Sequence, residues 1–119
     1  MKNPWYKTQA LASVADVLPD NDESLVVLEE AFETAVLAED GYRRLGCAVW
    51  AFAAAVNRGM STYAVHVLTR PGGLTDQIDG VEPEASRCYV LQMLIDAALP
   101  LGPDVYGPLR AALPCWRST

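Results

Sequence analysis

Glu29 and Glu33 form a carboxylate pair whose spacing could carry chemistry. Residues at i and i+4 share one face of a helix, and a carboxylate pair there can act in acid–base chemistry or bind a metal ion. Metal sites between paired helices usually add a Glu-x-x-His element, which this chain lacks. The pair therefore favours a solvated helix face, with Arg43 and Arg44 on the following helix as its expected partners.

His66 is the only histidine. No cysteine or acid lies three or four residues away from it, so metal ligation on its own helix is not supported. Residues 76–80 lack the aspartate ladder of a calcium-binding loop, and no glycine-rich phosphate-binding motif occurs. The sequence therefore predicts no catalytic residue, no metal site and no cofactor.

The spacing of the cysteines and the hydropathy of the chain indicate the cellular compartment of the protein. The three cysteines, Cys47, Cys88 and Cys115, are odd in number and match no zinc or redox spacing, which favours free thiols in a reducing cytoplasm. The first residues show no apolar core of a signal peptide, and no apolar run reaches the ~18 residues that a membrane span needs. We therefore expect a cytoplasmic protein that does not insert into a membrane.

Charge is distributed unevenly along the chain. The net charge is −6, which argues against nucleic-acid binding because that relies on basic patches. Residues 1–40 carry nine acids and two lysines, whereas residues 41–75 carry four arginines and no acid. We therefore expect a protein partner with a complementary charge pattern.

The 119 residues fit one domain, and their periodicity predicts helices throughout. Asn3 and Pro4 are a good helix start, Asp20 a second one, and Ser61 a third. Residues 45–56 are apolar on every face, which predicts the central buried helix and places Trp50 in the core. The expected fold is a single all-α domain over residues 1–119, with about six helices in three antiparallel pairs at residues 4–40, 42–70 and 83–114.

Residues 70–83 are the one long segment without a clear pattern. Leu74 and Ile78, at i and i+4, could hold a short helical turn against the core. The acids that follow, Asp76, Asp79 and Glu82, could then neutralise Arg43, Arg44 or Arg58. Alternatively the loop projects and contacts a partner, as loops of this length often do.

The three inter-helix turns, near residues 19–23, 57–61 and 100–104, recur about every 40 residues, a period typical of helical solenoids. Residues 11–25 are similar to a HEAT first helix with its Asp-containing turn, and residues 25–36 to a second helix. The chain thus resembles HEAT-type helical repeat proteins, most closely over residues 8–38. It departs from them in lacking the basic residue early in the second helix and an Asp in the middle turn. The resemblance implies a right-handed stack of helix pairs, and a compact six-helix bundle stays open as the alternative.

A HEAT-like stack implies a concave surface lined by the second helix of each pair. The leading hypothesis is therefore a non-enzymatic protein–protein interaction module, such as an acidic inhibitor, immunity or regulatory protein. The residues expected on its partner-binding surface are Glu29, Glu33, Tyr63, His66, Arg70 and Arg110.

Two alternatives remain. A helical domain could bind an anionic small molecule, or act on it as an enzyme, through the four arginines of the acid-free stretch, Arg43, Arg44, Arg58 and Arg70. Trp5 and Trp116, near the two ends of the chain, could also join two copies into a homodimer.

Overall fold

The computed structural model describes residues 3–113, so the predictions made for Cys115 and Trp116 lie outside the described residues. Within this range all regular structure is helical, which confirms the predicted fold class. Six helices of nine residues or more are joined by a one-turn helix and two short 3-10 helices. In chain order the elements are α1 (Pro4–Val17), α2 (Asn21–Ala35), α3 (Gly41–Asn57), α4 (Ser61–Thr69), α5 (Leu74–Gln77), η1 (Ile78–Gly80), α6 (Glu84–Ala98), η2 (Leu99–Leu101) and α7 (Pro103–Ala111).

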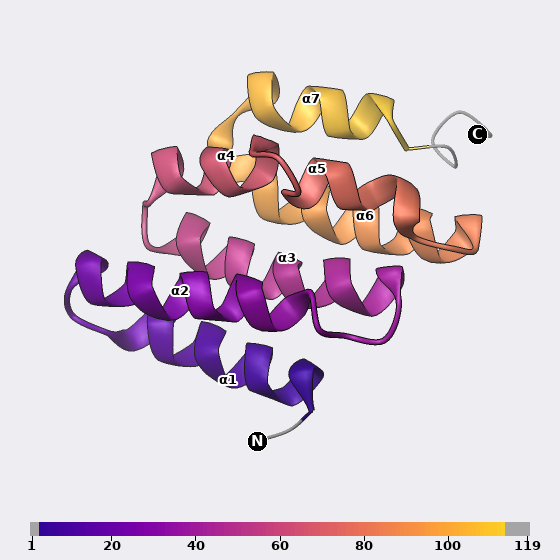
Figure 1. The fold of residues 1–119 in the computed structure, drawn as a ribbon. Helices are drawn as coiled ribbons and strands as arrows, with labels where there is room; N and C mark the ends of the chain where they lie inside the picture. The colour runs from indigo at the N-terminus through magenta and orange to yellow at the C-terminus, as the bar shows by residue number, and fades with distance from the viewer. Residues whose placement is uncertain (1–2, 114–119) are drawn as a thin grey trace.

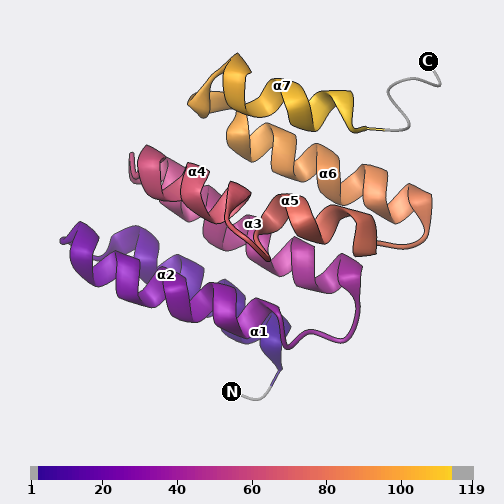
Figure 2. The same cartoon turned by 45° about the horizontal axis from the view of Figure 1, so that its top comes forward.

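The helices form three antiparallel pairs, α1/α2, α3/α4 and α6/α7, stacked in chain order (Figure 1). Helices α1, α3 and α6 lie side by side, because α3 contacts both of the others. Helix α2 packs on α1 and α3, and α4 packs on α3, so α3 is the central element. The turned view shows α2 and α4 in front of this layer, with α7 at the far end of the stack (Figure 2).

Helix α3 is buried over most of its length, because residues 45–56 leave it no polar face. Leu45, Cys47, Phe52 and Ala55 are fully buried, and ten of its seventeen residues are buried in all. Small side chains such as Ala51 let neighbouring helices approach closely. The predicted central helix is therefore confirmed, although Trp50 is only partly buried and packs at the rim of the core.

Helix starts follow the sequence in two of three predicted cases. The Asn3 side chain accepts a hydrogen bond from the Trp5 backbone N–H at 2.9 Å, and Asp20 caps α2 in the same way. The prediction for Ser61 is wrong, because Ser61 is already the first residue of α4 and Met60 precedes it without a side-chain cap. The backbone N–H groups in the first turn of α4 therefore receive no hydrogen bond from a capping side chain.

The connection at residues 70–83 is ordered by α5 and η1. Leu74 is 2% exposed and Ile78 is 8% exposed, so these two side chains do hold a helical turn against the core. The expectation that acids of this segment neutralise arginines is wrong. Asp76 accepts a hydrogen bond from the Gly72 backbone N–H instead, because that partner lies within its own turn.

Gly41 allows a close backbone approach where the start of α3 meets η1. A Cβ atom on Gly41 would overlap the carbonyl oxygen of Gly80. We expect Gly41→Ala to lower the free energy of unfolding by about 1–3 kcal/mol, as overpacking does. Gly107→Ala is the matched control, because space around Gly107 is open inside α7 and alanine should stabilise that helix by up to about 1 kcal/mol. Urea unfolding of both variants checks the opposite signs, and equal effects would contradict the packing of α3 on η1.

Candidate binding site between α2 and α4

A polar network joins α2 to α4 around the carboxylate of Glu29. The Tyr63 hydroxyl donates to Glu29 Oε2 at 2.5 Å. Arg70 donates through both terminal nitrogens, to Oε1 and Oε2, each at 3.1 Å. This two-point pairing fixes the direction of the guanidinium as well as its position. The network therefore holds the exposed edges of two separate helix pairs in one arrangement.

The electrostatics of the network follow from partial burial and from its donors. Burial by itself would raise the pKa of Glu29, but the hydrogen bonds from Arg70 and Tyr63 outweigh it. Together with the positive charges of Arg70 and His66, they hold the pKa of this carboxyl below its ordinary value. Burial and the hydrogen bond to Glu29 in turn raise the pKa of Tyr63. Glu29 is thus a stable carboxylate and Tyr63 a neutral donor at neutral pH, which suits recognition better than proton transfer.

Phe32 packs against two members of the network, Arg70 and Tyr63. Its ring is buried, the guanidinium carbon of Arg70 lies 5.7 Å from the ring centroid, and the Tyr63 ring lies 6.3 Å away. A cation above an aromatic ring is attracted to it, and packing restricts the rotamers of both neighbours. The Arg70 side chain is only 26% exposed, so this stacking and its ion pair are shielded from water on one side.

A cavity of about 230 Å³ adjoins the network. Glu33 and Arg70 contribute its charged walls, and Val36 and Pro71 contribute apolar ones. Val36 is 53% exposed and the neighbouring Leu37 is 71% exposed, although both are apolar. The surface beside the network therefore combines a hollow, fixed charges and uncovered apolar side chains.

The structure brings together most of the residues predicted for a partner-binding surface. Glu29, Tyr63 and Arg70 form the network, Glu33 lines the adjoining cavity, and His66 is exposed on α4. Arg110 is not part of this group, because it lies on α7 over the Tyr106 ring, at the other end of the stack. The predicted pairing of Glu29 with Arg43 or Arg44 is wrong, since Arg70 is the partner of Glu29.

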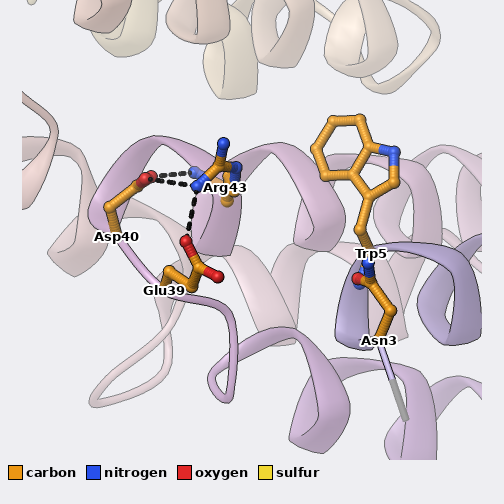
Figure 3. A network of polar contacts seen from close by, with 5 residues as sticks. All are labelled: Asn3, Trp5, Glu39, Asp40 and Arg43. Carbon is orange, nitrogen blue, oxygen red and sulfur yellow. Dashed lines mark hydrogen bonds and ion pairs between the residues drawn. The ribbon is translucent and has the colours of Figure 1, made fainter.

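The four arginines of the acid-free stretch do not converge. Arg43 donates to Glu39 at 2.9 Å and to Asp40 at 3.2 Å (Figure 3). Arg58 lies at the opposite end of α3, where it donates to the Asn21 side chain and to backbone carbonyls at the end of α1. Its guanidinium therefore satisfies helix-end carbonyl groups. Arg44 is exposed, and its side chain has no hydrogen bond or ion pair within residues 3–113.

Residues 3–113 contain neither a cluster of metal-binding side chains nor a helix that could span a membrane. Among residues 3–113, His, Cys, Asp and Glu side chains nowhere gather in threes at a spacing that could hold a metal ion. In the same range no helix is both long enough and apolar enough to cross a lipid bilayer. Cys47 is buried inside α3, and this burial raises the pKa of its thiol.

The network predicts a specific pH dependence of stability. Because the pKa of Glu29 is lower in the folded chain than its ordinary value of 4.5, Glu29 stabilises the fold above that pH and loses this contribution as the pH falls. Glu29→Gln should cost about 1 kcal/mol at pH 7, and the difference from the natural chain should shrink as the pH falls below 4.5.

Urea unfolding between pH 7 and pH 3 measures this difference. Glu33→Gln is the control, because Glu33 lies one turn further along α2 and its side chain makes no hydrogen bond or ion pair with any described residue. A Glu29→Gln penalty that is as large at pH 3 as at pH 7, or a Glu33→Gln penalty of equal size at pH 7, would contradict the assigned role of the network.

No protein-family model matches this chain, and comparisons with curated proteins and with solved structures return no significant match.

Proposed function

We propose that this protein is a non-enzymatic protein–protein interaction module, and that its partner docks on the outer surface of α2 and α4. The observation that carries the proposal is the Glu29–Tyr63–Arg70 network, which fixes charged groups between two helices beside exposed apolar side chains. A surface ordered before binding loses less conformational entropy on association. We call this the α2–α4 surface, defined by Val26, Glu29, Glu33, Val36, Leu37, Tyr63, His66 and Arg70.

The composition of the α2–α4 surface favours a partner with an apolar centre and basic groups around it. Val26, Val36 and Leu37 are each more than half exposed. Glu33 is exposed on the same helix, and the chain as a whole carries a charge of −6. Interfaces commonly place apolar residues at the centre and charged ones at the rim, where opposite charges speed association. An acidic inhibitor, immunity or regulatory protein of a basic target fits this description.

Three further predictions from the sequence belong to the same proposal. A HEAT-like relationship would account for partner binding by the second helices of stacked pairs, and a reducing cytoplasm would account for the free Cys47 and Cys88. Self-association through the Trp5 end stays a prediction as well. The alternative, an anionic ligand held by arginines, has less support because Arg43, Arg58 and Arg70 already bind groups of this chain.

Site-specific photo-crosslinking tests the proposal. A benzophenone amino acid is placed at Val36 on the α2–α4 surface, or at Val14 on α1 as the control. The two valines are matched, since Val36 is 53% and Val14 is 46% exposed. We expect a discrete crosslinked protein from Val36 in cells that express the chain at its natural level, and none from Val14. The same crosslinked protein from Val14 alone would place the interface on α1 instead.

A further inference from the structure

A second hollow lies at a corner of the molecule that the proposed function does not use. Its volume is about 700 Å³, and it opens where the start of α1 meets the α2–α3 connection and the start of α3. Three aromatic residues line it, Trp5 and Tyr6 from α1 and Tyr42 from α3. The charged residues Glu39 and Arg43 line it as well. We call this hollow the corner pocket.

Two of the three aromatic rings are held in place by further rings. The Trp5 ring contacts the Trp50 ring edge-on, with centroids 4.5 Å apart and planes at 68°. The Tyr42 ring lies 6.3 Å from that of Tyr89. The backbone N–H of Trp5 is bonded to the Asn3 side chain, which fixes the turn that carries the indole (Figure 3). The aromatic wall is therefore preorganised, while Tyr6, at 58% exposed, is open to solvent.

The charged groups of the pocket wall are one carboxylate, on Glu39, and one guanidinium, on Arg43. Arg43 is shared by two carboxylates, Glu39 and Asp40, through the same terminal nitrogen (Figure 3). Within this ion-pair group two carboxylates share one guanidinium, whereas the exposed Arg44 next to it is not part of the pocket lining. The Glu39 side chain is 85% exposed, so its carboxylate remains reachable from the pocket. An anion entering here would meet an arginine whose charge is already compensated.

We propose that the corner pocket binds an organic cation, namely an alkylammonium group. The electron-rich faces of aromatic rings attract ammonium groups, and tryptophan is the most favourable of them. A nearby carboxylate adds a charge contact that does not require the ammonium group to lose its whole hydration shell. Such a group occurs in quaternary ammonium compounds and in lysine side chains, and the two share the chemistry that this pocket recognises.

Titrations followed by nuclear magnetic resonance test this inference. The backbone amides of residues 38–43 and the Trp5 indole N–H, assigned with Trp5→Phe, report on the pocket. Choline is the quaternary probe, Nα-acetyl-lysine methylamide is the lysine probe, and 3,3-dimethylbutan-1-ol is the uncharged isostere of choline. We expect saturable shifts at roughly millimolar dissociation constants for at least one cation and no saturation with the alcohol. The cation that binds more tightly indicates whether the pocket prefers a quaternary ammonium compound or a lysine side chain.

Charge variants complete the test. Glu39→Gln should weaken cation binding about two- to fivefold, and Arg43→Met should strengthen it by a similar factor because it frees two carboxylates. Glu23→Gln, an exposed acid on α2 outside the pocket, should change nothing. Equal shifts with the neutral alcohol, no saturable shift with either cation, or weaker binding in Arg43→Met would each overturn the inference. The α2–α4 surface is not probed by these residues, so neither result bears on the proposed partner.

Discussion

Replacing residues 74–79 with a Gly/Ser linker of the same length should lower the free energy of unfolding by about 3–6 kcal/mol. The replacement removes Leu74 and Ile78, which are buried against the core at 2% and 8% exposure. It also removes the Thr75 hydroxyl that donates to the Leu68 carbonyl at 3.0 Å. Urea unfolding monitored by circular dichroism measures the loss.

A second linker that keeps Leu74 and Ile78 but replaces the four other residues of the segment is the control. It should recover most of the stability, because the two buried side chains supply most of the apolar burial in this segment. Unchanged stability in the first variant, accompanied by lost partner binding, would instead make residues 74–79 part of an interface. Unchanged stability with unchanged binding would make the segment a passive connector.

Phe52→Ala should lower the free energy of unfolding by about 3–5 kcal/mol. Phe52 is completely buried in the middle of α3, which packs against both α1 and α6, so the cavity left behind is enclosed on several sides. The midpoint of urea unfolding measures the effect. Val17→Ala on α1 is the control, since Val17 is 79% exposed and its removal should change stability by less than about 0.5 kcal/mol.

Trp50→Ala should cost less than Phe52→Ala, although sequence alone places Trp50 in the core. Trp50 is partly exposed and borders a shallow hollow between α1 and α3, where neighbouring side chains and water can fill the space that it leaves. Its loss also removes the ring contact with Trp5, which is worth about 0.5–1.5 kcal/mol beyond the buried area. A larger effect at Trp50 than at Phe52 would show that the contact between α1 and α3 around Trp50 is packed more tightly than the core around Phe52.

The helices could be predicted because their signals are local. The apolar run at residues 45–56 marks α3, and Asn3, Pro4 and Asp20 mark helix starts through contacts that span two or three residues. Leu74 and Ile78 likewise reveal their turn by helical spacing. The residues at which helices begin and end are harder to predict than the helices themselves. Helix α7 begins at Pro103 and contains Pro108 in its interior, a position where proline usually interrupts a helix.

The candidate site could be predicted only in part, because its contacts join residues far apart in the chain. The types of Glu29, Tyr63 and Arg70 mark them as surface residues of second helices, yet Tyr63 lies 34 and Arg70 lies 41 positions from Glu29. Proximity in sequence pointed to Arg43 and Arg44 instead. Phe32, the support of the network, shows only as one more apolar residue of α2, and nothing in its spacing indicates the cation above it.

The most direct test of the account is the affinity of the crosslinked partner for two matched variants, Val36→Asp and Val14→Asp. Val36 lies on the α2–α4 surface and Val14 on α1, at nearly equal exposure, so neither change should unfold the chain. The account predicts that Val36→Asp raises the dissociation constant at least about tenfold, a loss of ~1.4 kcal/mol, while Val14→Asp leaves it unchanged. Unchanged affinity in Val36→Asp, with weakened binding in Val14→Asp, would contradict it.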